Sequence, residues 1–569
     1  MTARISYLLV AALVVLGLAG CGKQGGQGGA AGTALLELVP ADTPYVAVST
    51  RRLPKKLVER QLAASAASAN ENTEKLRQLL EEGELPSDSL EKLARLGLAI
   101  SEEVQGKLTP EGIASLGFPL QGRNLIYGLG LLPVGWAEIT DAAKVNAFLD
   151  RVEKRAGIHS TPASFQNVNY RRYDLGRVVA VAAIRDDHLV VGALPARSEQ
   201  TLLPKLLGLE KPQQSLAAAG TLKAFEKTHG FAGFGSGYVD LRRLLEMMLG
   251  EARGLNAEVL DALGFERPPV STGCRNLAGY LVGQVPKIGF GFVSADDQGY
   301  RLDTVVEAAP PVANWFKTLS AAVPGLGADQ KGLFEAGLAL DLTQLRGGIK
   351  KMLATVIEQG RDCERVKPEA LKQAMQSVDV MFNPMLASIR GFDLVLDEVR
   401  MGPNGEPAGA SGHLLIAALD PRGLLGMLGM FSPDLAALQV PADGTPVRLP
   451  LDKLSPQAPP MWVASKDQAL AVFFGSRAPA DTSAVLSAAP GPQGLLLVFR
   501  YNMKKLFALI GPALKQLPPM GGAEEQEMRK QLESMAAVAR HYERVEMGIQ
   551  GRDDGLVISS TIRFATDAK

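Results

Sequence analysis

The chain has 569 residues, of which 46% are hydrophobic and 21% are charged, proportions typical of a globular protein with a large core. Its 60 lysine and arginine residues equal its 60 aspartate and glutamate residues, so no excess charge favours nucleic acid or a strongly acidic partner. The length predicts roughly two to four domains at ~150 residues each.

The N-terminus has the order of a secretory signal. Arg4 is followed by an almost wholly apolar run at residues 5–18 and then by small residues. This run is shorter than the ~20 apolar residues that a membrane-spanning helix needs. Residues 18–21, Leu-Ala-Gly-Cys, resemble the lipobox of bacterial lipoproteins. The resemblance implies that residues 1–20 are removed and that Cys21 becomes the first mature residue, with a diacylglycerol on its sulfur and an acylated amine. The alternative is a cleaved secretory signal in which Cys21 has no special role.

Residues 21–33 are predicted to be the lipidated cysteine and a tether. Residues 22–32 are mostly Gly, Ala and Gln, so we expect a flexible linker with an r.m.s. reach of about 17–20 Å. Gly22 stands where lipoproteins kept at the inner membrane usually have Asp. By this resemblance we expect the protein at the outer membrane, facing the periplasm, with the membrane as its partner through the acyl chains on Cys21.

A local unit recurs along the rest of the chain. An apolar strand ends in Asp, Asn or Ser and is followed at once by an amphipathic helical pattern. A short polar side chain at a helix start accepts hydrogen bonds from unpaired backbone N–H groups, and a carboxylate also suits the positive end of the helix dipole. We therefore interpret these residues as helix caps rather than as catalytic groups. They include Asp141, Asp240, Asp341, Asp420 and Asn502.

The order of these units predicts a tandem duplication, with a first copy at residues 34–310 and a second at 311–569. Each copy also holds hairpins around Asp-centred turns. Strands joined by hairpins and interrupted by helices predict an α+β fold with largely antiparallel sheets. The alternative is that a common strand-turn-helix order imitates a repeat. The corresponding positions include Asp141 and Asp420, Asp187 and Asp467, and Asp240 and Asn502.

The start of the first copy resembles a known family. Residues 38–46, Leu-Val-Pro-Ala-Asp-Thr-Pro-Tyr-Val, resemble the opening of a family of large bacterial envelope proteins known only as a domain of unknown function, whose members begin with a Leu-Pro-Ala-Asp-Thr-Pro type sequence. The strand-Asp-helix units and the Ala-rich segment 215–223 fit the same family. The resemblance extends over nearly all of residues 35–569, and it implies no activity, ligand or catalytic residue.

Two cysteines remain once Cys21 is set aside, Cys274 and Cys363. An even pair in an oxidising compartment predicts a disulfide. Because Cys274 lies late in the first copy and Cys363 early in the second, we expect the bond to join the two copies. The alternative is a pair of buried free thiols.

The motifs that mark common chemistries are missing from the sequence. The five histidines are scattered, with no His-Glu-x-x-His spacing and no Cys-x-x-Cys, so no zinc site is predicted. Gly233–Gly237 is rich in glycine but lacks the Gly-Lys-Ser/Thr ending of a phosphate-binding loop. No Gly-x-Ser-x-Gly turn is present. We therefore predict no catalytic residue, no cofactor and no metal ligand.

Three functions agree with these observations. The first is a lipid-anchored, periplasm-facing envelope protein that binds or scaffolds a protein partner without catalysing a reaction. The second is a carrier of lipid or another apolar ligand, which requires a large apolar cavity. The third is a hydrolase whose catalytic groups are dispersed in the sequence, because such a site is defined by geometry and not by chain position.

Overall fold

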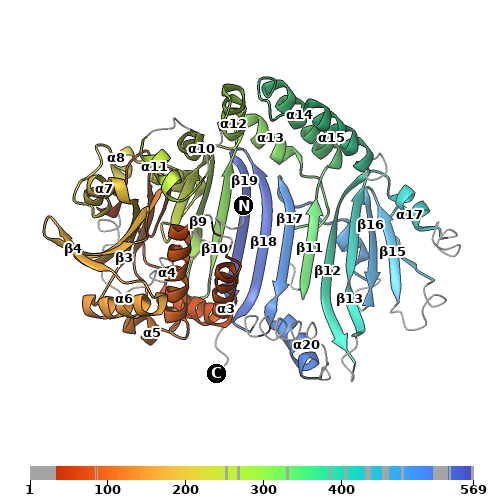
Figure 1. The fold of residues 1–569 in the computed structure, drawn as a ribbon. Helices are drawn as coiled ribbons and strands as arrows, with labels where there is room; N and C mark the ends of the chain where they lie inside the picture. The colour runs from red at the N-terminus through yellow and green to blue at the C-terminus, as the bar shows by residue number, and fades with distance from the viewer. Residues whose placement is uncertain are drawn as a thin grey trace. The chain divides into compact units, whose positions relative to one another are not determined.

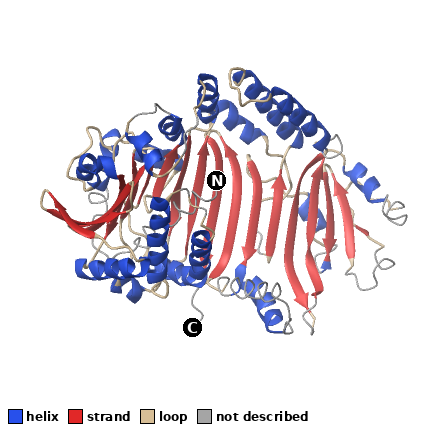
Figure 2. Ribbon diagram, in the orientation of Figure 1, coloured by secondary structure: helices blue, strands red, loops and turns tan. Residues whose placement is uncertain are grey.

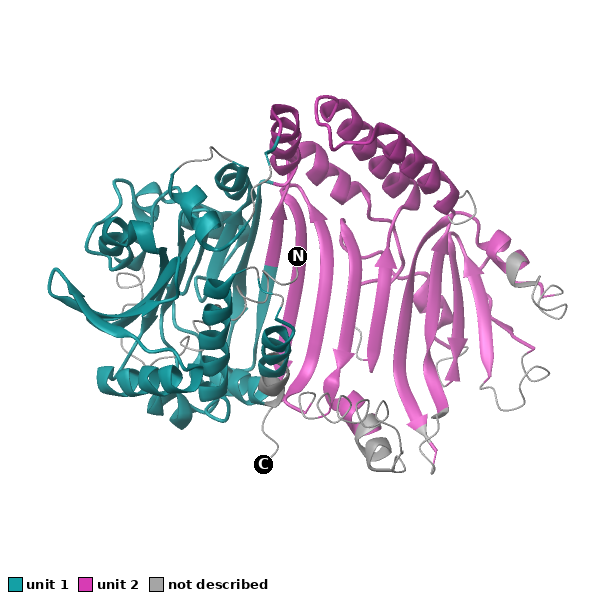
Figure 3. Cartoon of the chain, in the orientation of Figure 1, with its two compact units in different colours: residues 1–270, 286–303 teal, residues 271–285, 304–569 magenta. Residues whose placement is uncertain are grey.

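The computed structural model describes residues 34–83, 85, 87–249, 254–265, 269–328, 332–382, 387–402, 407–429, 438–450, 460–475, 480–516, 536 and 540–565. The predicted signal peptide, Cys21 and the tether lie outside these residues. Within the described part, no helix combines the length and the apolar character that crossing a bilayer requires. The chain forms two compact units, residues 1–270 with 286–303 and residues 271–285 with 304–569 (Figure 3).

The fold class is α+β with antiparallel strand pairing, as the sequence predicts. Two of the predicted hairpins are confirmed. Strand β6 (Val178–Arg185) pairs with β7 (His188–Pro195), and β15 (Met461–Lys466) pairs with β16 (Ala469–Phe474). Asp186 and Asp467 occupy the same position of the two turns with φ of 51°, a left-handed conformation that Asp tolerates in tight turns. The residue that matches Asp467 is therefore Asp186, one position before the predicted Asp187.

The first unit has one sheet in which β1 occupies a central position. The strands pair in the order β4, β5, β6, β7, β3, β2, β1, β8, β9 and β10. Residues 299–303 of β10 belong to this unit, and residues 304–307 belong to the second unit. The remaining bounds are β1 (Tyr45–Val48), β2 (Asn124–Leu129), β3 (Leu132–Glu138), β4 (Thr161–Phe165), β5 (Val168–Asp174), β8 (Ser236–Asp240), β9 (Lys287–Ala295) and β10 (Gly299–Glu307).

A large hydrophobic core joins the helices of the first unit to its sheet. Val58, Val104, Ile113 and Phe148, from α3, α4, α5 and α6, pack in one cluster with Val178 and its neighbours on β5–β7. Each such side chain contributes roughly 1.5–3 kcal/mol on burial. The helices are α3 (Lys55–Glu81), α4 (Asp88–Val104), α5 (Pro110–Ser115), α6 (Ala142–Ala156), α7 (Glu199–Leu206), α8 (Leu216–Ala219), α9 (Thr221–His229), α10 (Leu241–Leu249) and α11 (Leu255–Ala262).

The second unit has a sheet in the order β14, β15, β16, β13, β12, β11, β17, β18 and β19. Its strands are β11 (Phe334–Ala339), β12 (Ile389–Met401), β13 (Pro407–Ala418), β14 (Val447–Arg448), β17 (Leu495–Asn502), β18 (Tyr542–Arg552) and β19 (Gly555–Phe564), besides β15 and β16. Its helices are α12 (Thr272–Gln284), α13 (Pro310–Thr318), α14 (Leu342–Gln359), α15 (Pro368–Met381), α17 (Pro421–Gly429), α19 (Thr482–Leu486) and α20 (Met503–Gln516). Helix α12 belongs here although its sequence precedes β9 and β10, so the compact units interleave along the chain.

The polar residues at the strand–helix junctions are helix caps, as predicted. In each case a side-chain oxygen accepts a hydrogen bond of about 3 Å from a backbone N–H two or three residues later, which satisfies donors that the first helical turn leaves unpaired. The pairs are Asp141 with Ala143 and Lys144, Asp240 with Arg243, Asp341 with Thr343 and Gln344, Asp420 with Gly423, and Asn502 with Lys505.

Candidate functional site

One side of the second unit's sheet is apolar, and we call it the open face. Directly opposed residues of antiparallel strands lie on the same side of a sheet, as do residues two apart along a strand. The register places three cross-strand rows on this side of β19, β18, β17, β11 and β12. Apart from one serine, all their residues are apolar or aromatic. The rows are Ile558, Ile549, Leu497, Leu338, Phe392; Ser560, Met547, Phe499, Ala336, Leu394; and Ile562, Val545, Tyr501, Phe334, Leu396.

The open face is accessible although its strands are central in the sheet. Phe392 is 37% exposed and Met547 is 46% exposed, and of the fifteen residues in the rows only Ala336 is buried. On the opposite side of the same strands, Val395 and Val557 are fully buried. Figure 2 shows no helix across the near side of β11, β12, β17 and β18. The described elements therefore leave one side of this sheet uncovered.

Helices border the open face at both ends of its strands. Helix α13 contacts β18 and β19, and α20 contacts β12, β17 and β18. Figure 1 shows α13, α14 and α15 beyond one end of the strands and α20 beyond the other. Trp315 of α13 donates a hydrogen bond from Nε1 to the carbonyl of Gln344 on α14, at 3.2 Å. Helices α14 and α15 carry apolar residues but no buried side chain, so they add accessible apolar surface at this border.

A pocket of about 360 Å³ lies at the α20 end of the open face. Phe334 and Tyr501 line it, and both also belong to the third row of the open face. Their ring centroids are 5.1 Å apart. The pocket is thus continuous with the apolar rows. Its polar lining comes from Glu335, Arg500, Asn502, Lys505, Glu543 and Arg544.

Three charged residues of the pocket lining, Glu335, Arg500 and Arg544, belong to a ladder on the side of the sheet opposite the open face. Arg500 Nη1 donates to Glu335 Oε2 at 2.6 Å, and Arg500 Nη2 donates to the Gly327 carbonyl at 3.0 Å. Glu546 bridges two arginines, with Oε2 at 3.4 Å from Arg500 Nε and Oε1 at 2.7 Å from Arg544 Nε. Burial raises the pKa of Glu335, and the charge and hydrogen bond of Arg500 oppose that shift. Ion pairing therefore holds a buried carboxylate and a half-buried guanidinium together in the sheet.

Asp393 lies on the same side of the sheet as Glu335. It is 1% exposed, and its Oδ1 has no hydrogen-bond partner within the described structure. Burial, and then the charge of Glu335, raise the pKa of Asp393 to about 7. This carboxyl group therefore takes up a proton near neutral pH, which avoids placing an unpaired negative charge beside that of Glu335.

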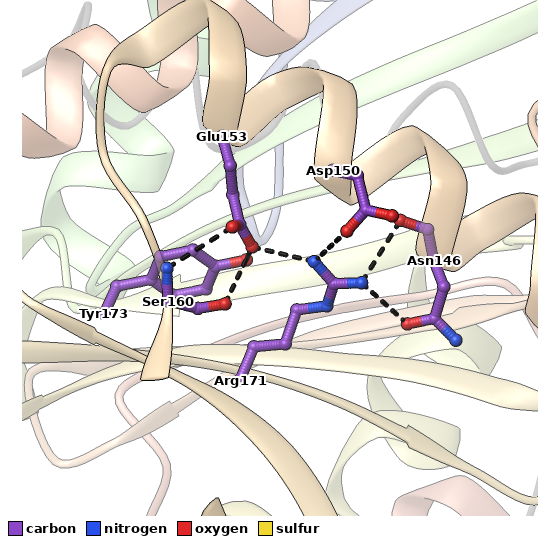
Figure 4. Close-up of polar contacts among 6 residues, drawn as sticks. All are labelled: Asn146, Asp150, Glu153, Ser160, Arg171 and Tyr173. Carbon is purple, nitrogen blue, oxygen red and sulfur yellow. Dashed lines mark hydrogen bonds and ion pairs between the residues drawn. The ribbon is translucent and has the colours of Figure 1, made fainter. Parts of the chain in front are cut away.

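Another buried carboxylate, Glu153 of α6, ties that helix to β5 in the first unit (Figure 4). Glu153 Oε1 accepts hydrogen bonds from Arg171 at 2.8 Å, the Ser160 hydroxyl at 2.8 Å and the Tyr173 hydroxyl at 3.0 Å. Burial alone would raise the pKa of Glu153, but these donors outweigh it and lower the pKa. Asp150 also binds Arg171, at 2.7 Å. The group is fully paired, so we assign it a structural role.

Cys274 and Cys363 are at disulfide distance, with Cα atoms 4.4 Å apart. The bond joins the first turn of α12 to the loop between α14 and α15, and both segments belong to the second unit. The bond therefore links a residue of the predicted first copy to one of the predicted second copy, but it lies within a single compact unit, because α12 packs with the second unit. Within the described residues, Cys274, Cys363 and Glu364 form a group close enough to share a metal ion, but the disulfide occupies both sulfurs.

Sequence reasoning missed the charged groups of the second unit. Glu335, Asp393 and Arg500 each interrupt an apolar strand, in Phe-Glu-Ala-Gly-Leu, Phe-Asp-Leu-Val-Leu and Val-Phe-Arg-Tyr. A charged residue flanked by strand-forming apolar residues was the signal in the sequence that could have indicated a charged group within the sheet. Which of these residues meet across the sheet depends on strand order, which local pattern does not give.

The comparisons with known proteins add no relative. Neither the models of protein families, nor the curated proteins, nor the solved structures contain a match to this chain. The resemblances to bacterial lipoproteins and to the envelope family stay predictions.

Proposed function

We propose that this protein is a lipid-anchored envelope protein, facing the periplasm, that binds an apolar ligand or partner without catalysing a reaction. The open face is the observation that carries the binding function. The largest exposed apolar patch of a monomeric soluble protein, typically a few hundred Å², is often a functional site. Five strands and three rows of the open face span roughly 19 by 14 Å, at ~4.8 Å between strands and ~3.4 Å per residue.

The second candidate function is a carrier of lipid or another apolar ligand. The open face supports this function because it offers aliphatic and aromatic side chains, while the backbone groups of its strands are already hydrogen-bonded within the sheet. The described pocket is small and has a charged lining, so the apolar contact surface is a sheet face rather than the large enclosed cavity expected of a carrier. A hydrolase receives less support, since Glu335 and Asp393, the carboxyl groups with raised pKa values, are each 1% exposed.

We also propose that the two units descend from a tandem duplication. Their strand orders correspond element by element, β5, β6, β7, β3, β2, β1, β8, β9 in the first and β14, β15, β16, β13, β12, β11, β17, β18 in the second. The caps support the same alignment, because the Asp240 N–H donates to the Pro44 carbonyl and the Asn502 N–H donates to the Leu333 carbonyl.

The alignment assigns the charged ladder to the second copy alone. One residue row of the first sheet contains Gly289, Tyr238, Val46, Tyr127 and Val134. Tyr238, Val46, Tyr127 and Val134 are buried and apolar or aromatic. The matching row of the second sheet contains Glu546, Arg500, Glu335, Val395 and His413. The offset of 262 between Asp240 and Asn502 also relates Tyr238 to Arg500 (502 − 240 and 500 − 238). Charges at core positions of one copy only favour a specialised role for the second unit.

The binding function is tested with a dye that fluoresces on apolar surfaces, such as 1-anilinonaphthalene-8-sulfonate. Phe392→Ser removes a central ring of the open face and should lower dye binding several-fold. Phe290→Ser is the matched control, because Phe290 is 36% exposed on β9 of the first unit. Equal loss in both variants, or no dye binding by the folded wild-type chain, would overturn the assignment of the open face as the binding surface.

The envelope location has a separate test. Cys21→Ser should abolish incorporation of labelled palmitate and release the protein from membranes into the soluble periplasmic fraction. Wild-type protein that carries no label and needs no detergent for extraction would contradict the lipid anchor.

A further inference from the structure

We propose that the open face and the pocket at its α20 end bind one amphiphile, with an acyl chain on the open face and an anionic headgroup, a carboxylate or a phosphate, in the pocket. This inference rests on the proposed binding function and names its ligand. It is carried by the continuity of the apolar rows with the pocket, by the size of the pocket, and by the charge of the elements around both.

The apolar rows lead into the pocket without interruption. Phe334 and Tyr501 are opposed residues of the third row and also line the pocket. The preceding rows hold Phe499 and Leu497 on the same strand, at two-residue spacing. A flexible chain can therefore lie across the rows, at roughly 14 Å from the first to the third, with its polar end at the charged lining.

The pocket suits a headgroup better than a protein segment. Its volume of about 360 Å³ is at the lower end of small-molecule sites, which hold roughly 300–1,000 Å³. A helix with its side chains is about 10–12 Å wide, so it could rest on the open face but not enter the pocket. An acyl chain with a compact headgroup could occupy both, with the chain on the open face and the headgroup in the pocket.

The charge of the bordering helices favours an anion. The pocket lining itself has three cationic side chains, Arg500, Lys505 and Arg544, and two acidic ones, Glu335 and Glu543. Glu335 pairs with Arg500, and Glu546, next to the lining, pairs with both Arg500 and Arg544. Helices α13, α14, α15 and α20 together contain eight Lys or Arg and three Asp or Glu. Asn502 and Lys505 also place the pocket at the N-terminus of α20, where the helix dipole is positive. Positive helices around an apolar surface match the two parts of an anionic lipid.

The test compares three ligands that share one chain length: dodecanoate, dodecyl phosphate and dodecanol. The whole chain is used with Cys21→Ser, which removes the predicted acylation site, and binding is followed by titration calorimetry. We expect one or both anionic ligands to bind at least tenfold more tightly than dodecanol, and Phe392→Ser to weaken all three. Preference for one anion identifies the headgroup class.

Charge reversal then locates the headgroup. Lys505→Glu should remove the preference for the anions while dodecanol binding remains. Lys227→Glu, an equal charge change at an exposed position of α9 in the first unit, should leave the preference unchanged. Lys505→Gln repeats the test if Lys505→Glu does not fold, as judged by circular dichroism.

The possible failures are distinguishable. Equal affinity for dodecanol and the anions, with loss of all three in Phe392→Ser, overturns the headgroup site and leaves the apolar binding function intact. Binding of inorganic phosphate alone, or of an acidic amphipathic peptide in place of all three ligands, also overturns the inference. Failure of every ligand and of the fluorescent dye overturns both the inference and the binding function.

Discussion

Asp393 lies directly across from Gly337 in the register of β12 and β11. A Cβ at position 337 would lie 3.1 Å from Asp393 Oδ1 and in collision with the side chain of Leu326. The glycine therefore makes room both for the buried carboxyl group and for the loop that covers it.

Gly337→Ala should destabilise the protein by about 1–3 kcal/mol, because the added methyl group overpacks a filled site. Gly347→Ala is the control, since a Cβ at this helical position meets no atom within 4 Å; alanine there should stabilise α14 by up to about 1 kcal/mol. Urea denaturation measures both. A neutral effect of Gly337→Ala would contradict the tight packing at this site.

The pKa of Asp393 predicts a stability that falls as pH rises. The folded-state pKa is about 7, whereas an unfolded Asp titrates near 3.9, so the folded state binds the extra proton between these values. The favourable contribution is complete below the unfolded pKa and is lost as pH rises through the folded pKa. Asp393→Asn should therefore gain stability over the wild type by about 1.4 kcal/mol per pH unit between pH 5 and 6.5. A difference that is constant from pH 5 to 8 would exclude this titration.

Arg500 holds the charge of Glu335 inside the sheet. Arg500→Met should cost about 3–5 kcal/mol, because it leaves a buried carboxylate without its partner. The double variant Glu335→Gln with Arg500→Met should recover a large part of this loss, as it removes both charges. Chemical denaturation of the two variants at pH 7 checks the difference. If the double variant is no more stable than the single one, packing rather than charge explains the effect.

The disulfide predicts a mass change and a loss of stability on reduction. Reduction of the pair should add about 2 Da to the intact chain, and replacing Cys274 and Cys363 by Ser should lower the free energy of unfolding. The bond closes a loop with a sequence separation of 89 residues, for which chain entropy predicts about 4–5 kcal/mol. Intact-mass spectrometry before and after reduction tests the mass change. Two free thiols in the absence of reductant would contradict the disulfide.

Much of the fold follows from local sequence. Asp141 and Asp420 were predictable as helix caps because capping depends on residues only two or three positions apart. The two hairpin turns were predictable for the same reason, since a short turn selects residues that tolerate positive φ, although the first turn has its positive φ at Asp186 and not at the predicted Asp187.

The candidate site could not be predicted in this way. The open face depends on which strands become neighbours, because alternating apolar residues on β11, β12, β17 and β18 form one surface only after residues far apart in sequence pair. The same is true of Glu335, Arg500 and Asp393, which come from three strands. Packing between distant segments also decides that α12 belongs to the second unit, and therefore which unit holds the disulfide.

The sequence by itself determined the α+β class, the order of strands and helices, the caps, the hairpin turns and the cysteines available to pair. These features are encoded in short windows, where backbone conformation and hydrogen bonding depend on near neighbours. The tertiary structure alone decided the strand order, the uncovered apolar face and the charges buried beneath it, because burial and electrostatic pairing are properties of residues brought together from across the chain.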